Sequence, residues 1–258
     1  MGVSQRLVVL EVPPVNSIEL IFHILILGAD VINKLIGILD VMGGTGSIIE
    51  FFGPGAGTLS ATGMATICNM GAECGSTTSI FPYSAAMSAY MDATARPEHA
   101  QAARTLSAHL QADEGAEYDL VIEIDLSTLE PHINGPFTPG LSTPLSKFGE
   151  AVKEAEWPEK LTTGLIGSCT NSSFEDMTRA ANLAQQALAA GLAPKMPLLV
   201  SPGSEQTRAT LKASGTMQIF ESLGSTMLTN ACGPCCGSWD RQDVKKVIIL
   251  SRAPGLNT

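Results

Sequence analysis

Short apolar segments alternate with helical segments along most of this chain, and that alternation constrains its fold more than any other feature. We expect strands at residues 47–52, 118–125, 161–166, 196–200 and 226–228. The expected helices are residues 31–39, 62–74, 84–95, 98–110, 175–190, 204–214, 216–223 and 240–246. Strands that alternate with helices form parallel sheets linked by crossover helices. The sequence therefore predicts an α/β fold with mostly parallel sheets.

A segment rich in proline and glycine, residues 129–144, is expected to lack regular structure. We interpret it as a connector between a first α/β domain, residues 30–128, and a second, residues 145–246. Residues 1–29 and 247–258 flank these domains. A chain of 258 residues has room for roughly two domains of ordinary size, which agrees with this division.

Composition excludes several classes of protein. The chain carries 15 basic and 25 acidic residues, a net charge of −10, which argues against nucleic acid as a partner. Its longest apolar run, residues 20–27, is far shorter than the ~20 residues that cross a bilayer, so we expect no membrane association. Residues 1–16 show no signal or transit pattern. Six cysteines are too few for a disulfide scaffold of this length, which indicates a reducing compartment.

Three cysteines follow expected strands in two turns that contain glycine. Cys169 follows the strand at residues 161–166, and Cys232 and Cys235 follow the strand at residues 226–228. Carboxyl ends of parallel strands meet at one edge of a sheet, where sites gather. Three thiolates suit an iron–sulfur cluster that keeps one iron free of protein ligands. The spacing favours such a cluster but also allows a redox Cys-x-x-Cys pair with Cys169 as a separate buried thiol.

Six segments carry a family resemblance. They are Gly-Gly-Thr-Gly at 43–46, Thr-Gly-Met-Ala-Thr-Ile-Cys-Asn-Met-Gly-Ala-Glu at 62–73, Pro-His-Ile-Asn-Gly-Pro-Phe-Thr-Pro at 131–139, Gly-Leu-Ile-Gly-Ser-Cys-Thr-Asn-Ser-Ser at 164–173, Ser-Pro-Gly-Ser-Glu-Gln-Thr-Arg at 201–208 and Asn-Ala-Cys-Gly-Pro-Cys at 230–235. Together they closely resemble the aconitase family, of its mitochondrial type, from about residue 30 to residue 246.

The resemblance implies an aconitase-like fold of two three-layer α/β/α units and a [4Fe–4S] cluster held by Cys169, Cys232 and Cys235. It implies a hydro-lyase that interconverts citrate and isocitrate through cis-aconitate in the tricarboxylic acid cycle, with the fourth iron as a Lewis acid. It also implies catalytic roles for Asn69 and Glu73 near the cluster. These two residues are four apart, so one helix would project both to the same face.

The resemblance further implies a small tricarboxylate as the substrate, a mostly monomeric state and a mitochondrial matrix location, or else the cytoplasm because no transit sequence is visible. The segments of the family that supply a serine base and most carboxylate-binding arginines have no match in this chain. We therefore expect this polypeptide alone to have little or no activity. Two alternatives remain open: a catalytically dead remnant that binds an iron–sulfur cluster, and a paralogue that acts on a related tricarboxylate in biosynthesis.

Overall fold

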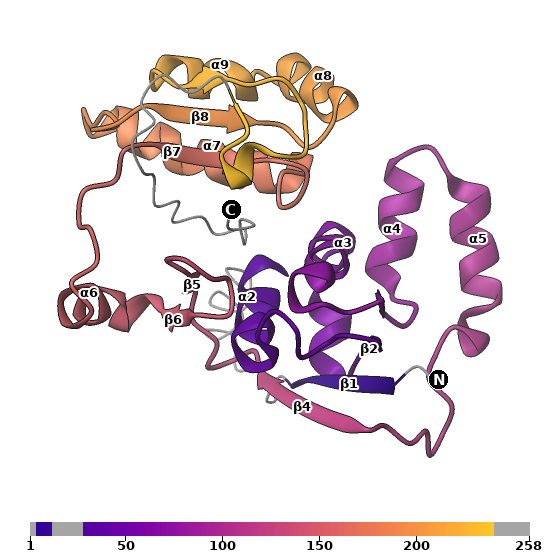
Figure 1. The fold of residues 1–258 in the computed structure, drawn as a ribbon. Helices are drawn as coiled ribbons and strands as arrows, with labels where there is room; N and C mark the ends of the chain where they lie inside the picture. Colours follow the sequence, from indigo (N-terminus) through magenta and orange to yellow (C-terminus); the bar gives the residue numbers. More distant parts are fainter. Residues whose placement is uncertain (1–3, 12–27, 240–258) are drawn as a thin grey trace. The chain divides into compact units, whose positions relative to one another are not determined.

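The computed structural model describes residues 4–11 and 28–239 of the chain. The chain divides into two compact units between Pro131 and His132. Unit 1 comprises the described residues up to Pro131, and unit 2 the described residues from His132 onward. The division falls inside the proline-rich and glycine-rich segment 129–144. The helix expected at residues 240–246 lies outside the described residues. Figure 1 shows the helices and strands of both units.

Unit 1 is built on a sheet with the order β3-β2-β1-β4, in which every neighbouring pair is parallel. Its strands are β1 (Ser4–Glu11), β2 (Ser47–Phe52), β3 (Thr78–Ile80) and β4 (Leu120–Asp125). Strands β2 and β4 correspond to the strands expected at residues 47–52 and 118–125. Strand β1 pairs with both of them, in the interior of the sheet, although the sequence predicts no strand there. Its partners are distant in sequence, so a local pattern does not reveal them.

The helices of unit 1 follow the expected apolar periodicity, with two corrections. They are α2 (Gly28–Leu39), η1 (Pro54–Thr58), α3 (Ala61–Met70), η2 (Gly71–Cys74), α4 (Ala85–Ala93), α5 (Pro97–Thr105) and η3 (Ser107–His109). The helix expected at residues 62–74 ends at Met70 and continues as the 3₁₀ turn η2, which Gly75 ends with a φ of 83°. The helix expected at residues 98–110 is interrupted at Leu106, between α5 and η3.

The core of unit 1 lies between α2, α3 and one face of the sheet. The apolar side of α2 is fully buried from Val31 to Ile36 and packs in one cluster with Phe51 of β2. The Phe51 ring stacks on the Phe81 ring, with centroids 4.5 Å apart. Helices α2 and α3 approach so closely that a Cβ on Gly28 would lie 2.3 Å from the backbone oxygen of Gly63. Only glycine permits this crossing without displacing one helix.

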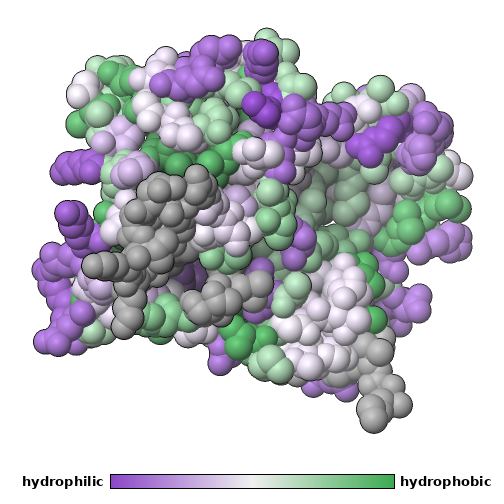
Figure 2. Space-filling view, turned by 45° about the horizontal axis from the view of Figure 1, so that its top comes forward, coloured by the Kyte–Doolittle hydropathy of each residue, from purple (hydrophilic) through white to green (hydrophobic). Residues whose placement is uncertain are grey.

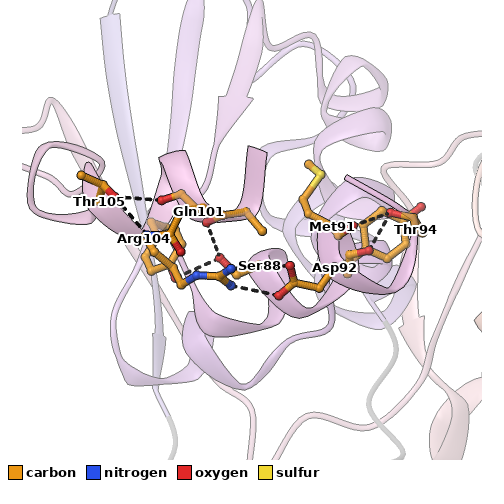
Figure 3. A network of polar contacts seen from close by, with 10 residues as sticks. Ser88, Met91, Asp92, Thr94, Gln101, Arg104 and Thr105 are labelled. Atoms are coloured by element: carbon orange, nitrogen blue, oxygen red, sulfur yellow. Dashed lines mark hydrogen bonds and ion pairs between the residues drawn. The ribbon is translucent and has the colours of Figure 1, made fainter. Parts of the chain in front are cut away.

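Helices α4 and α5 form a hairpin that hydrogen bonds stabilise (Figure 3). Arg104 Nη1 donates to Asp92 Oδ2 at 2.9 Å, which links α5 to α4. Both side chains are about two-fifths exposed (40% and 43%), so the pair stabilises the hairpin by no more than ~1 kcal/mol. The buried Ser88 hydroxyl donates to the backbone oxygen of Ala100 across the hairpin. Apolar burial is sparse between these helices, and polar contacts provide much of the specific pairing.

Unit 2 begins with a short antiparallel pair, β5 (His132–Asn134) and β6 (Ser142–Pro144). The expectation that residues 129–144 lack regular structure is therefore wrong. The ladder tolerates the prolines because Pro144 occupies the last position of β6, while Pro136 and Pro139 lie in the connecting loop. Helix α6 (Leu145–Glu154) follows directly, and the sequence analysis does not anticipate it.

The main sheet of unit 2 is parallel, with the order β7-β8-β9. Its strands are β7 (Gly164–Gly167), β8 (Leu198–Ser201) and β9 (Thr226–Met227), and its helices are α7 (Phe174–Ala189), α8 (Glu205–Ala213) and α9 (Thr216–Ser222). Met177 of α7, Leu211 of α8 and Phe220 of α9 share one buried cluster with Val200 of the central strand. The 3₁₀ turn η4 (Pro234–Cys236) ends the described chain's regular structure. The predicted α/β class with mostly parallel sheets is confirmed.

Hydrophilic and hydrophobic residues are interspersed on the face drawn in Figure 2. The most exposed large apolar side chains include Met42, Leu183 and Leu192. Within residues 4–11 and 28–239, none of the helices combines the length and the apolar composition that a bilayer crossing requires.

Candidate functional site

Cys169 lies in a loop that follows β7 and leads into α7, and its side chain is exposed. The loop begins at Ser168, which is buried and has a φ of 127°. Ser168 N donates to the backbone oxygen of Ser201 at 3.0 Å, and the hydroxyl of Ser172 donates back to the oxygen of Ser168. These bonds fold the loop over the carboxyl end of β8. The thiol of Cys169 therefore projects from a backbone that is fixed on both sides.

Glycine is required where this loop begins. Gly167 has a φ of 95°, and a Cβ built on it would lie 2.0 Å from the backbone oxygen of Ser201. A side chain at this position would separate β7 from β8 and displace Cys169. The segment therefore uses glycine for close strand approach.

The loop ends in a capping box at the start of α7. Ser173 Oγ accepts a hydrogen bond from Asp176 N at 3.2 Å, and Asp176 Oδ2 accepts from Ser173 N at 3.0 Å. Ser173 is therefore the N-cap of α7. Burial raises the pKa of Asp176, which the hydrogen bonds from Ser173 partly offset. The box stabilises the junction between the Cys169 loop and its helix by about 1 kcal/mol.

Cys232 lies in a loop that follows β9, and its thiol is also exposed. Leu228 N donates to the oxygen of Val200 at 2.8 Å, which fixes the start of the loop beside β8. Gly233 has a φ of 126° and introduces the turn η4, which contains Cys235 and Cys236. Strands β7 and β9 flank β8 on opposite sides, so the two cysteine loops leave the same edge of the sheet.

The sulfurs of Cys169 and Cys232 are in contact. Cys169 Sγ donates to Cys232 Sγ at 3.8 Å, although the two residues are 63 positions apart in sequence. Both are free thiols. The pKa of Cys232 is raised, first by its hydrogen bond with Cys169 and then by the charge of a Cys169 thiolate, with smaller contributions from desolvation and from Cys235 and Cys236. Two thiolates in contact repel each other, so the pair retains a proton unless a cation separates them.

Cys235 and Cys236 differ in what they contact. The Cys236 thiol donates to the backbone oxygen of Gly233 at 3.0 Å, inside its own turn. This bond indicates that Cys236 is a packing or supporting thiol. Cys235 is a half-buried free thiol whose charge contributes to the raised pKa of Cys232, so it lies within electrostatic range of that sulfur. The structure thus brings together Cys169 and Cys232 and carries Cys235 on the same turn.

Asn69 and Glu73 lie in unit 1. Asn69 is exposed near the end of α3, whereas Glu73 is half-buried in the 3₁₀ turn η2. The helix changes type between them, so the argument that one α-helical face carries both residues does not hold. Burial raises the pKa of the Glu73 carboxyl. This carboxyl therefore keeps its proton to a higher pH than an exposed glutamate does.

Unit 1 contains two further thiols, Cys68 and Cys74, whose pKa values are raised. Burial raises the pKa of Cys68 to about 11, and its thiol donates to the oxygen of Ser79 at 3.7 Å. Cys74 is fully buried and donates to the oxygen of Gly71 at 3.1 Å. Burial raises its pKa as well. Both thiols behave as small hydrophobic residues.

In the part of the chain that the structure describes, no three His, Cys, Asp or Glu side chains surround a common point as ligands of a single metal ion would. Unit 2 instead carries four free thiols on two loops, and three of them, Cys169, Cys232 and Cys235, are the candidate donors. Thiolates are the ligands that iron–sulfur clusters use, and each binds a different corner of the cluster. Such ligands need not converge on one point. The donors therefore fit a cluster better than a single ion.

Sequence reasoning misses two residues beside this site, Glu205 and Asn230. Asn230 Nδ2 donates to Glu205 Oε2 at 2.7 Å. The bond links the Cys232 loop to the first turn of α8. Both residues lie in segments that carry the family resemblance, 201–208 and 230–235, but nothing in the sequence pairs them.

A family model described as "Aconitase family (aconitate hydratase)" matches residues 18–253. The mitochondrial aconitate hydratase of Emericella nidulans is 60% identical over 217 residues, which cover 84% of this chain and 28% of that protein. The mitochondrial homocitrate dehydratase of Saccharomyces cerevisiae is 58% identical over 220 residues, with the same coverage of 84% and 28%. The chain thus spans 28% of the length of these curated relatives.

Among solved structures, the holo form of Thermococcus kodakaraensis aconitase X matches with a TM-score of 0.41 and 14% sequence identity. The match covers 89% of this chain and 44% of that one.

Proposed function

Because the chain belongs to the aconitase family, we propose that it is the part of an aconitate hydratase that holds a [4Fe–4S] cluster through Cys169, Cys232 and Cys235. The observation that carries this proposal is the 3.8 Å contact between Cys169 Sγ and Cys232 Sγ. Two loops from different strand ends present free, exposed thiols to one another, and a third thiol, Cys235, follows in the turn η4 directly after Cys232. Exposed thiols in contact are costly to ionise without a cation, which is what a cluster supplies.

The proposed reaction is the interconversion of citrate and isocitrate through cis-aconitate, and the relatives' names support it. When bound, a cluster with three protein thiolates supplies one Lewis-acidic iron for a hydroxyl and a carboxylate. The protein must position the thiolates and move protons. Hydroxide is a poor leaving group, and the proton that leaves lies next to a carboxylate, so both ends need assistance.

We assign Glu73 a proton-holding role in this reaction. Its carboxyl is half-buried and its pKa is raised by burial, so it can hold a proton at Oε and give it to a departing hydroxyl. Asn69 has a neutral amide, which can orient a polar substrate group without changing its charge. The family resemblance implies that both residues are catalytic, and the raised pKa of Glu73 supports the proton-holding role that we assign to it.

The substrate we propose is a small tricarboxylate, and the location we propose is mitochondrial, as the names of the relatives say of those proteins. Homocitrate is a second candidate substrate, because one relative is named a homocitrate dehydratase. The chain is 60% identical to an aconitate hydratase and 58% identical to a homocitrate dehydratase. These similar identities support the addition or removal of water as the reaction, but they do not distinguish the two acids.

A chimera tests the reaction. Residues 30–246 replace the matching segment of the Emericella nidulans aconitate hydratase, and hydration of cis-aconitate and of its homologue is followed by absorbance. We expect hydration of cis-aconitate to be retained, and loss of activity in the same chimera with Cys232→Ser. A chimera that folds, binds iron and converts neither acid contradicts the proposed reaction.

A cysteine series tests the ligand set in the chain itself. The chain is reconstituted with iron and sulfide without oxygen, and bound iron, bound sulfide and visible absorbance are measured. Cys169→Ser, Cys232→Ser and Cys235→Ser should each abolish the cluster absorbance. Cys236→Ser is the matched control, because its thiol donates to Gly233 inside the turn and should leave the absorbance intact. Equal loss in all four variants contradicts the assignment.

A further inference from the structure

We propose that Glu205 and Asn230 are positioning residues that set the spacing of the Cys169 and Cys232 thiols. Asn230 Nδ2 donates to Glu205 Oε2 at 2.7 Å. The segment Gly203, Ser204 and Glu205, which follows the central strand β8, thereby anchors the loops that follow both neighbouring strands. The inference deepens the proposed function, since it assigns a role toward the same thiols.

The Cys232 loop has few anchors of its own. Among the hydrogen bonds between described residues, residues 229–232 make two, and these are Asn230 to Glu205 and Cys169 to Cys232. The second one joins the two thiols to each other, so it cannot fix them relative to the scaffold. The bond from Asn230 is therefore the link between the Cys232 loop and the secondary structure of unit 2 at this point.

The Cys169 loop is anchored to the same short segment. Gly203 N donates to the oxygen of Ser172 at 3.1 Å, and a Cβ on Gly203 would lie 3.0 Å from that oxygen. Ser204 then caps α8, because its hydroxyl accepts from Thr207 N at 3.1 Å. Glu205 is the next residue. One three-residue segment thus contacts one cysteine loop through Gly203 and the other through Glu205.

The chemistry of the Asn230 amide makes this contact directional. Its oxygen is buried and has no hydrogen-bond partner among the described residues, while its nitrogen faces a carboxylate. The reverse orientation would place the amide oxygen against the carboxylate oxygen, where two acceptors repel. A charged acceptor also strengthens the bond. Glu205 Oε2 also forms an ion pair with Arg208 Nη1 at 3.5 Å, one turn further along α8.

The test measures the proximity of the two thiols without iron. The reduced chain is treated with glutathione disulfide, so that two protein thiols are oxidised to a disulfide while glutathione disulfide is reduced to two glutathione thiols. The rate at which the Cys169–Cys232 cross-linked peptide forms is followed by mass spectrometry. Iron content after reconstitution with iron and sulfide is measured in parallel.

We expect Glu205→Ala and Asn230→Asp to slow cross-linking by about tenfold, as the loss of a charge-assisted bond predicts, and to lower bound iron. Glu205→Gln keeps an acceptor and should lie within about twofold of the wild type. The double variant Glu205→Gln with Asn230→Asp exchanges donor and acceptor, so it should recover most of the rate that Asn230→Asp loses. Arg208→Gln is the control, which removes the other partner of Glu205 and should change the rate by less than about twofold.

Wild-type rates in both Glu205→Ala and Asn230→Asp overturn the inference, as does a double variant that is no faster than Asn230→Asp. Glu205 is 76% exposed, so its alanine variant folds even if an aspartate at 230 does not. If the wild-type chain binds no cluster but the variants slow cross-linking as expected, the positioning role stands and the proposed function fails. If the chain binds a cluster and the variants change neither readout, the positioning role fails alone.

Discussion

Unit 1 and unit 2 are both built on parallel sheets, but different forces hold their chemically important residues. Unit 1 buries long apolar side chains in one cluster that includes Ile32, Ile36 and Phe51, and its thiols, Cys68 and Cys74, are packed with it or beside it. Unit 2 has a smaller described cluster, and its thiols lie outside it on loops. Apolar packing therefore stabilises the first unit, whereas backbone and side-chain hydrogen bonds position the site of the second.

The largest effect that separates the two regions is expected at Phe51. Phe51→Ala should lower the free energy of unfolding by about 3–5 kcal/mol, because the ring is fully buried and stacks on Phe81. Denaturant unfolding measures this loss. The neighbouring Phe52 is 45% exposed, so Phe52→Ala should stay within about 0.5 kcal/mol. Equal losses in the two variants contradict the assignment of the core.

The next largest loss of stability is expected from a change of backbone conformation in unit 2. Gly167→Ala places a Cβ 2.0 Å from Ser201 O at a φ of 95°, and we expect a loss of about 3 kcal/mol and slower cross-linking of Cys169 with Cys232. Gly191→Ala is the control, since Gly191 has a φ of 68° but open space around it, and should cost only about 1 kcal/mol. Cross-linking at the wild-type rate in Gly167→Ala breaks the view that strand contact places the Cys169 loop.

The capping box predicts a smaller loss. Ser173→Ala removes the bond from Asp176 N and should lower the free energy of unfolding by about 1 kcal/mol, measured by denaturant titration. Ser222→Ala removes a hydroxyl that donates to the oxygen of Gln218 on an exposed helix face, and should change stability by less than about 0.5 kcal/mol. A Ser173→Ala variant as stable as Ser222→Ala shows that the cap does not hold the loop.

A further effect, which appears only at high pH, concerns the thiol of Cys68 in unit 1. The pKa of Cys68 is raised from 9.0 to about 11 by burial, so the folded chain keeps this proton to a higher pH than the unfolded chain. Its contribution to stability is present below about pH 9 and is lost as pH rises through about 11. Between these two pH values, the melting temperature of the wild type should fall more steeply with pH than that of Cys68→Ala. Identical slopes of melting temperature against pH contradict the raised pKa of Cys68.

Alkylation compares the same thiol with those of unit 2. At pH 8, Cys68 should react with iodoacetamide more slowly than Cys169, because burial raises the pKa of Cys68 to about 11 and partly covers its side chain, whereas the side chain of Cys169 is exposed. Peptide mass spectrometry separates the two rates. Equal alkylation rates of Cys68 and Cys169 would contradict the difference between the packed thiols of unit 1 and the loop thiols of unit 2.

Apolar periodicity predicts much of the fold. Ser84, Ser173 and Ser204 each cap a helix at or within two residues of its expected start, and strand β2 matches its expected bounds. Strand β1 is missed because its two partners lie elsewhere in the sequence. Strands β5 and β6 are missed because prolines are compatible with strand ends and loops, which a local pattern of breakers does not distinguish.

The site is only partly visible from sequence. The position of Cys169 and Cys232 after strands predicts that they meet, since carboxyl ends of parallel strands share an edge, and the 3.8 Å contact agrees. The role of Asn230 depends on Glu205, which lies 25 residues earlier in the sequence, so no single short segment contains both residues. The sequence predicts one helix for Asn69 and Glu73, but α3 ends at Met70 and Glu73 lies in the 3₁₀ turn that begins at Gly71.

The central claim is that three thiols of unit 2 hold a four-iron cluster with one iron free of protein ligands. Mössbauer spectroscopy of the chain reconstituted with ⁵⁷Fe and sulfide tests it most directly. The account predicts four irons per chain, of which one is distinct and alone changes its spectrum when citrate is added. Four equivalent irons that citrate leaves unchanged, or no bound iron in a folded chain, would contradict it.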